Sequence, residues 1–88
     1  MIRESDIEAY LGERVKAVGG EVRKVRWIGR QGAPDRLVGW DGQHLLIELK
    51  APGEKAKPHQ LREHDRLRGI GFRVEVIDSY EGVDALLR

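Results

Sequence analysis

Apolar residues near the N-terminus recur at the spacing of one helix face: Ile7, Leu11, Val15 and Val18. The Gly19-Gly20 pair predicts the end of this helix, because glycine is common just beyond a helix C-terminus. Ser5 is followed three residues later by Glu8, a spacing typical of a capping box in which Glu8 accepts a hydrogen bond from the Ser5 main-chain N–H. We therefore predict a helix from near Ser5 to near Gly19.

Two apolar runs, at residues 34–40 and 44–50, lie on either side of an Asp41-Gly42 pair. Asp-Gly between such runs is a strong signal for a β-hairpin with a two-residue turn. A turn of this kind places Trp40 opposite Gln43 and determines which residues face each other along the rest of the two strands. The sequence therefore predicts both the hairpin and its register.

Continued outward, this register places Asp35 opposite Glu48, with Cβ atoms about 5 Å apart. Lys50 lies two residues beyond Glu48 and projects from the same face. Two like charges in a half-buried position repel, so at least one carboxyl group should be protonated unless a cation lies between them. Mg²⁺ prefers oxygen ligands, and a neighbouring ammonium group can hold and help to deprotonate a water molecule. The hairpin therefore predicts a small hydrolytic metal site.

The alternative is an ordinary strand pair that carries its charges on a solvated face. Flanking apolar residues on both faces favour covered strands instead: Leu37, Val38, Leu45, Leu46 and Ile47.

The remaining elements complete an α-β-β-β-α-β-α order. Residues 22–28 alternate and predict a strand, and Pro58 suits the first turn of a helix that ends near Gly69 or Gly71. Residues 72–77 predict a further strand, and residues 79–87 a short helix whose N-cap is Ser79. The strand that follows the helical crossover can lie parallel to its neighbour, so we expect a mixed sheet with helices on both faces and a single domain over residues 1–88.

Composition narrows the class of protein. The chain has no cysteine, which excludes a disulfide framework and a thiolate metal site. It has no apolar run long enough for a membrane span and no signal-peptide pattern, so we expect a soluble cytoplasmic protein. Lys and Arg outnumber Asp and Glu over residues 22–68, whereas acidic residues predominate at the two ends. A basic region around the predicted metal site suits a polyanionic substrate such as nucleic acid, although a solvated charged surface would look similar.

Several motifs together resemble the virus-type replication-repair nuclease (VRR-NUC) family of the PD-(D/E)XK nuclease superfamily. They are Gly32-Ala33-Pro34-Asp35-Arg36, Glu48-Leu49-Lys50-Ala51-Pro52-Gly53 and Gln60. The resemblance spans nearly the whole chain and implies a restriction-endonuclease-like α/β fold. It also implies that Asp35, Glu48 and the Leu49 carbonyl bind Mg²⁺ or Mn²⁺, that Lys50 orients or activates the attacking water, and that Gln60 supports the site. Without the resemblance, Gln60 would be an ordinary polar residue in the first turn of a helix.

The family pattern also includes a glutamate on the first helix. Glu8 is the first candidate, because it borders the buried stripe three residues before Leu11. The capping box with Ser5 would compete for the same carboxylate, so Glu4, one turn earlier, remains the alternative.

Basic residues around the predicted site are candidates for phosphate contacts, which position a nucleic acid without specifying its sequence. They are Lys24, Arg26, Arg30, Arg36, Lys55 and Lys57. For each of them a solvated cation is the plain alternative. We expect Trp27 and Trp40 to belong to the core or an interface, and the three histidines lack the spacing of a zinc site.

The resulting hypothesis is an Mg²⁺- or Mn²⁺-dependent DNA endonuclease. Stand-alone members of the family resemble Holliday-junction resolvases, which implies a homodimer that acts on branched, four-way DNA, and so compact a nuclease suits a phage. Two alternatives remain: a nuclease on linear or flapped DNA that works within a larger machine, and a non-catalytic DNA-binding module.

Overall fold

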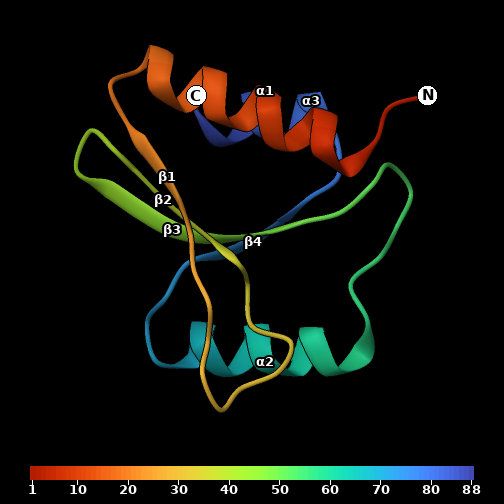
Figure 1. Cartoon of the computed structure of the whole chain (residues 1–88). Coiled ribbons are helices and arrows are strands. Elements are labelled where there is room, and N and C mark those ends of the chain that lie inside the picture. Colours follow the sequence, from red (N-terminus) through yellow and green to blue (C-terminus); the bar gives the residue numbers. More distant parts are fainter.

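A four-stranded mixed sheet lies between two helical layers in the computed structural model, which describes residues 1–88 (Figure 1). The elements follow the expected order: α1 (Glu4–Ala17), β1 (Glu21–Lys24), β2 (Arg36–Trp40), β3 (Gln43–Leu49), α2 (Pro58–Gly69), β4 (Val74–Ile77) and α3 (Tyr80–Leu86). The strands lie in the order β1-β2-β3-β4, antiparallel except for the parallel pair β3 and β4. The predicted meander and parallel crossover are therefore confirmed.

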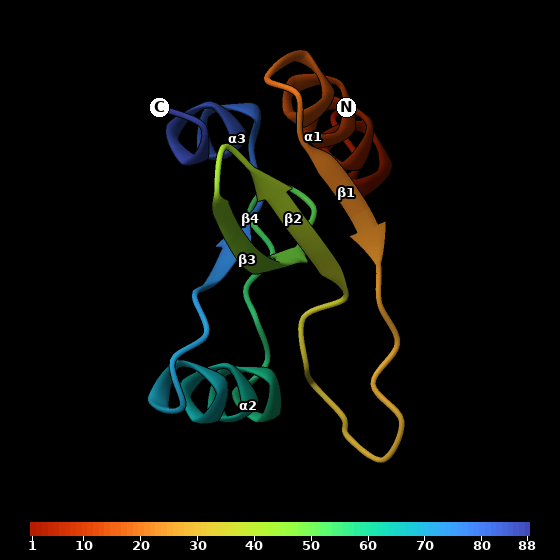
Figure 2. The ribbon, with the colours of Figure 1, turned by 90° about the vertical axis from the view of Figure 1, so that its left-hand side faces the viewer.

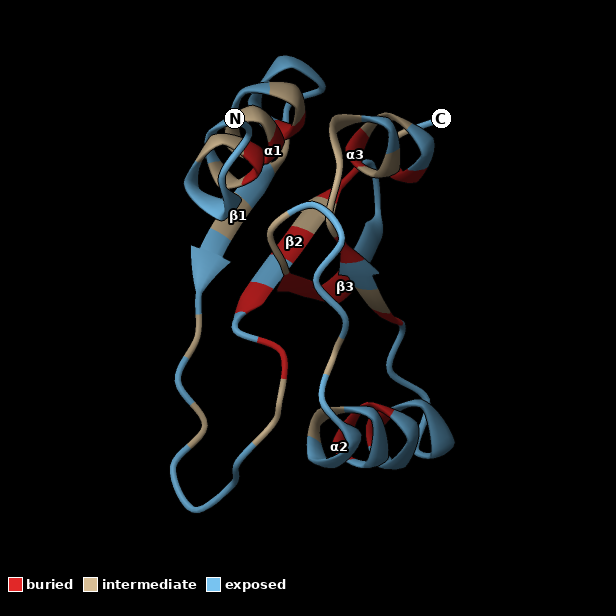
Figure 3. Ribbon diagram, turned by 90° about the vertical axis from the view of Figure 1, so that its right-hand side faces the viewer, coloured by how far each residue is buried: buried red, intermediate tan, exposed pale blue.

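The larger part of the core lies between the sheet and the layer formed by α1 and α3. Ile7, Leu11 and Val15 of α1 are fully buried, as the helical spacing predicted. They form one cluster with apolar residues of β2, β3, β4 and α3. Figure 3 shows the buried residues on the inner sides of α1 and α3 and along β2 and β3. No helix is long and apolar enough to cross a membrane.

The other face of the sheet is covered by α2 and by the connection between β1 and β2. A small cluster of Leu46, Leu67 and Val74 lies there, and Trp27 and Ala33 pack against it. Figure 2 shows the connection between β1 and β2 extending beside α2. Gly32 of this connection approaches α2 so closely that a Cβ atom would lie 3.1 Å from the Gln60 Cα atom. Its φ angle of 81° also favours glycine at this point.

The hairpin adopts the predicted register. Trp40 pairs with Gln43, and the antiparallel pairing continues to Arg36 and Ile47. Asp41 and Gly42 form the turn with positive φ angles of 46° and 76°, as a two-residue hairpin turn requires. The predicted register is thus confirmed from the Trp40–Gln43 pair to the Arg36–Ile47 pair, which lies next to Asp35 and Glu48.

Three local expectations were wrong. The first helix begins near Ser5, at Glu4, but the Arg3 main-chain N–H donates to Asp6 Oδ2 at 2.8 Å, so Asp6 rather than Glu8 takes part in the cap. The first strand ends at Lys24, because beyond it only the Val25 N–H bonds across, to the Asp35 carbonyl. The last strand starts at Val74 rather than at residue 72.

Candidate active site

Three predicted site residues meet at one end of the β2–β3 hairpin. Asp35 directly precedes β2, Glu48 is the last residue but one of β3, and Lys50 directly follows that strand. The Glu48 residue is 8% exposed, whereas the Asp35 side chain is 52% exposed. One carboxylate is therefore set into the sheet and the other faces solvent beside it.

The Asp35 carboxylate acts on Glu48 as the sequence suggested. Burial, reinforced by the charge of Asp35, raises the pKa of Glu48 to about 7. Burial also raises the pKa of Asp35. The Lys50 ammonium opposes both changes. Without a further cation this edge of the sheet therefore favours a protonated Glu48 near neutral pH.

Arg36 lies beneath the acidic pair rather than on the surface. Its side chain is 8% exposed, its Nη1 lies 2.9 Å from Asp35 Oδ1, and its Nη2 contacts Glu8 Oε2. The expected phosphate contact does not fit this position, because a guanidinium so buried and doubly paired is not open to a strand of DNA. Glu8 is likewise engaged: besides Arg36, it has Lys24 Nζ 3.8 Å away.

Glu4, the alternative helical glutamate, is exposed in the first turn of α1. Its charge contributes to raising the pKa of Glu48, so it lies within electrostatic reach of that group. Glu4 has no ion pair with a neighbouring cation, in contrast to Glu8. The geometry therefore favours Glu4 as the free carboxylate that α1 supplies to this edge.

His64 was not predicted to take part, and the structure places it directly behind Glu48. Its side chain is fully buried on α2, and Nε2 lies 3.8 Å from Glu48 Oε1. Neither ring nitrogen has a hydrogen-bond partner. Burial lowers the pKa of His64, and the charge of Arg68 acts in the same direction. The signal in the sequence was its helical spacing from Leu67, which places both residues on the buried face of α2.

The Gln60 side chain forms a hydrogen bond within the fold. Its Oε1 accepts a hydrogen bond of 2.8 Å from the Lys57 main-chain N–H and so caps the start of α2. Trp27 supports the site from the other side, because its indole N–H donates to the Pro34 carbonyl at 2.7 Å, next to Asp35. Trp40 is 8% exposed and belongs to the core, as expected of a strand aromatic.

The other basic candidates lie on the surface. Arg30 is 56% exposed and lies 3.5 Å from the buried Glu63, which also binds Arg66. Lys24 has a side chain that is 74% exposed. The remaining three are exposed as well: Arg26, Lys55 and Lys57.

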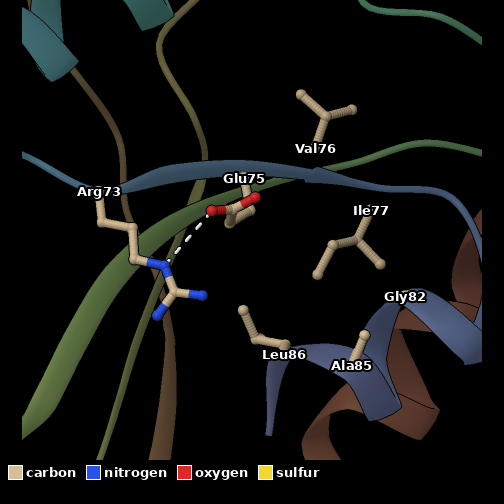
Figure 4. A pocket seen from close by; sticks show the side chains of 7 residues that line it. All are labelled: Arg73, Glu75, Val76, Ile77, Gly82, Ala85 and Leu86. Carbon is tan, nitrogen blue, oxygen red and sulfur yellow. Dashed lines mark hydrogen bonds and ion pairs between the residues drawn. The ribbon is translucent and has the colours of Figure 1, made fainter. Parts of the chain in front are cut away.

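Asp35, Glu48 and Lys50 line none of the pockets of the structure. A pocket between β4 and α3 contains none of the predicted site residues (Figure 4). Four of its seven lining residues are apolar, and the Arg73–Glu75 ion pair lies at its rim. A site outside any pocket suits a polymeric substrate that lies across it, whereas a small metabolite usually binds in an enclosed pocket.

The donor set fits a hard divalent cation. No group of three or more His, Cys, Asp or Glu side chains is arranged to hold a metal ion. Asp35 and Glu48 are two carboxylates at the same end of the hairpin, and Leu49, which follows Glu48, carries the main-chain oxygen that the family resemblance implies as a further ligand. That is the kind of site Mg²⁺ occupies while keeping several waters. A cation bound between the two groups would lower the pKa of Glu48, because it would oppose the effects of burial and of the Asp35 charge.

Comparisons with known proteins identify the family of this chain. A scan of protein-family models finds no match. Among curated proteins, "Putative nuclease p44" of Acyrthosiphon pisum secondary endosymbiont phage 1 is 48% identical over 82 residues, which cover 92% of this chain and 88% of the relative. A solved structure named "VRR_NUC domain" superposes with a TM-score of 0.86 at 43% identity, covering 99% of this chain and 96% of the other.

The chain belongs to the VRR-NUC nuclease family. The restriction-endonuclease-like fold expected from the resemblance is thereby confirmed, and so is the nuclease class. The motif residues Asp35, Glu48 and Lys50 of this VRR-NUC domain are the ones that converge at the end of the hairpin. Their individual roles in the nuclease remain predictions.

Proposed function

We propose that this VRR-NUC domain is an Mg²⁺- or Mn²⁺-dependent endonuclease that hydrolyses phosphodiester bonds of DNA. The observation that supports it best is the opposed pair of Asp35 and Glu48, with Lys50 near enough to act on both. A purely structural sheet edge would gain nothing from two carboxylates that repel each other. A bound cation would offset the charge that develops on the phosphoryl oxygens during hydrolysis.

In this proposal the residues of the chain have separate tasks. Asp35, Glu48 and the Leu49 carbonyl hold the cation. Lys50 donates hydrogen bonds to the nucleophilic water and orients it toward phosphorus. As the bond from the water oxygen to phosphorus forms, that water gives up a proton to the solvent, the bond from phosphorus to the leaving oxygen breaks, and the leaving oxygen takes up a proton from a second water. We assign the helical carboxylate to Glu4, because Glu8 is bound to Arg36.

The finer part of the proposal is a branched, four-way DNA substrate bound by a homodimer. Its support is the family resemblance together with exposed basic residues at the end of β1 and on the connections that follow β1 and β3: Lys24, Arg26, Arg30, Lys55 and Lys57. A two-fold dimer would present two such sites to a junction of matching symmetry. Phosphate contacts of this kind position DNA without specifying its sequence.

One cleavage panel tests the proposal. Four-way junction, flap, linear duplex and single-stranded DNA are incubated with Mg²⁺, Mn²⁺ or EDTA, using the wild type, Lys50→Ala and the matched control Lys16→Ala, an exposed lysine on α1. We expect cleavage of the junction in either metal, none in EDTA, and loss only in Lys50→Ala. Preferred cleavage of flaps or linear duplex would overturn the branched substrate. Metal-independent binding without any cleavage would identify a DNA-binding module instead.

Size-exclusion chromatography with light scattering tests the homodimer separately. A monomer that still cleaves junctions would remove the dimer from the proposal while leaving the nuclease site intact.

A further inference from the structure

Arg36 makes an arrangement of contacts that ordinary packing does not require. Its Nη1 lies 2.9 Å from Asp35 Oδ1 and donates to the Asp35 main-chain carbonyl at 3.2 Å. Its Nη2 contacts the Glu8 carboxylate on α1. One buried guanidinium therefore holds both the side chain and the main chain of Asp35, and is itself held by a helix that lies far from Asp35 in the sequence.

Attachment of α1 to the sheet does not depend on this contact. Ile7, Leu11 and Val15 already bury the apolar side of α1 in the main core. An apolar side chain at position 36 would extend that core at no cost in desolvated charge, since buried ion pairs are often no more stabilising than apolar residues of the same volume. The contacts that run from Glu8 through Arg36 to Asp35 therefore act mainly on the orientation of the Asp35 side chain.

We propose that Arg36 is a positioning residue for the metal-binding carboxylate of Asp35, and that Glu8 positions Arg36. The inference rests on the proposed function, because it takes Asp35 as a metal ligand. Arg36 engages Oδ1, so the second oxygen of Asp35 is left for the cation. A planar guanidinium suits this task, because its donors lie in a fixed fork, whereas a lysine would offer a single charged point. Glu8 and Arg36 thereby have one shared role in place of a metal ligand and a phosphate contact.

Hydrogen-bond partners of metal ligands change metal affinity by about 10- to 100-fold when they are removed. We therefore expect Arg36→Met to weaken Mn²⁺ binding about 10-fold or more, measured by titration calorimetry on the full chain without DNA. Glu8→Gln should weaken it less, because glutamine retains an oxygen that accepts from Arg36. Arg36→Lys should restore only part of the affinity. When Glu8→Gln is added to Arg36→Met, Mn²⁺ binding should not weaken further.

Matched measurements separate positioning from stability. Arg14 joins α1 to Asp84 of α3 at 3.2 Å and is half exposed. Arg14→Met should therefore lower stability in urea while leaving Mn²⁺ affinity unchanged. Unchanged Mn²⁺ affinity in folded Arg36→Met overturns the proposal. If Arg36→Met does not fold, Glu8→Gln tests the proposal instead. Mn²⁺ affinity of Glu8→Gln equal to that of the wild type would then overturn it.

Asp35→Asn distinguishes failure of this inference from failure of the proposed function. If Asp35→Asn binds Mn²⁺ as the wild type does, the metal site itself is wrong. If Asp35→Asn abolishes binding while Glu8→Gln and Arg36→Met leave it intact, only the positioning role is wrong. Weaker DNA binding by Arg36→Met with normal Mn²⁺ affinity would show that Arg36 contacts phosphate and would overturn the inference.

Discussion

Replacing Glu48 with glutamine in the metal-free protein should stabilise the fold above neutral pH. Glu48 is 8% exposed, and its pKa lies near 7 in the folded chain, against 4.5 for an unperturbed glutamate. At about 1.4 kcal/mol for each pH unit, this difference corresponds to about 3 kcal/mol. Partial hydration of the site reduces the effect, so we expect Glu48→Gln to gain about 1 to 3 kcal/mol at pH 8.5.

The direction of this pH dependence follows from proton linkage. Below pH 4.5 Glu48 is protonated in the folded and unfolded states, and its ionisation costs nothing. As the pH rises from 4.5 to 7, the unfolded chain loses the proton first, and the folded wild type loses stability relative to it. Glutamine has no proton to lose. The advantage of Glu48→Gln should therefore be small at pH 4.5 and complete above pH 7.

Urea unfolding in EDTA at pH 4.5 and pH 8.5 measures this difference. His64, whose pKa is lowered, lies 3.8 Å from Glu48, so the measured difference includes the effect on His64 of losing the Glu48 charge. Glu13→Gln is the matched control, because Glu13 is exposed on α1 and should change the free energy of unfolding by less than about 0.5 kcal/mol. An advantage of Glu48→Gln that is equal at the two pH values, or a loss at pH 8.5, would refute the reasoning.

Three further predictions concern the site and its surroundings. Lys50→Ala should retain the fold and Mn²⁺ affinity but lose most cleavage; full activity would remove Lys50 from the chemistry. Gln60→Ala should lower the free energy of unfolding by about 0.3–1.5 kcal/mol through loss of the α2 cap, with unchanged Mn²⁺ affinity in calorimetry; a raised KM for DNA without loss of stability would make it a substrate contact. DNA affinity should fall steeply with salt, and Lys55→Ala with Lys57→Ala should reduce the slope of log K against log salt by about 2; an unchanged slope would exclude both from phosphate contacts.

Local signals were sufficient for the fold and for the register of the hairpin. Asp41-Gly42 needs two positive φ angles, and that turn determined every pair up to Arg36 and Ile47. The limits of the first strand and the first helix could not be predicted in the same way. Asp6 and Glu8 are both able to accept from a main-chain N–H near the helix start, and only the position of that start decides between them.

The sequence by itself determined the order of the elements and the opposition of Asp35 and Glu48, because both follow from alternation and from one tight turn. Only the tertiary structure decided which charges are buried and paired. The packing of α1 on the sheet brought Glu8 to Arg36, and the packing of α2 brought His64 behind Glu48. These contacts join residues far apart in the chain. No local pattern contains them, since the pKa and the partner of a charged group depend on what the fold places beside it.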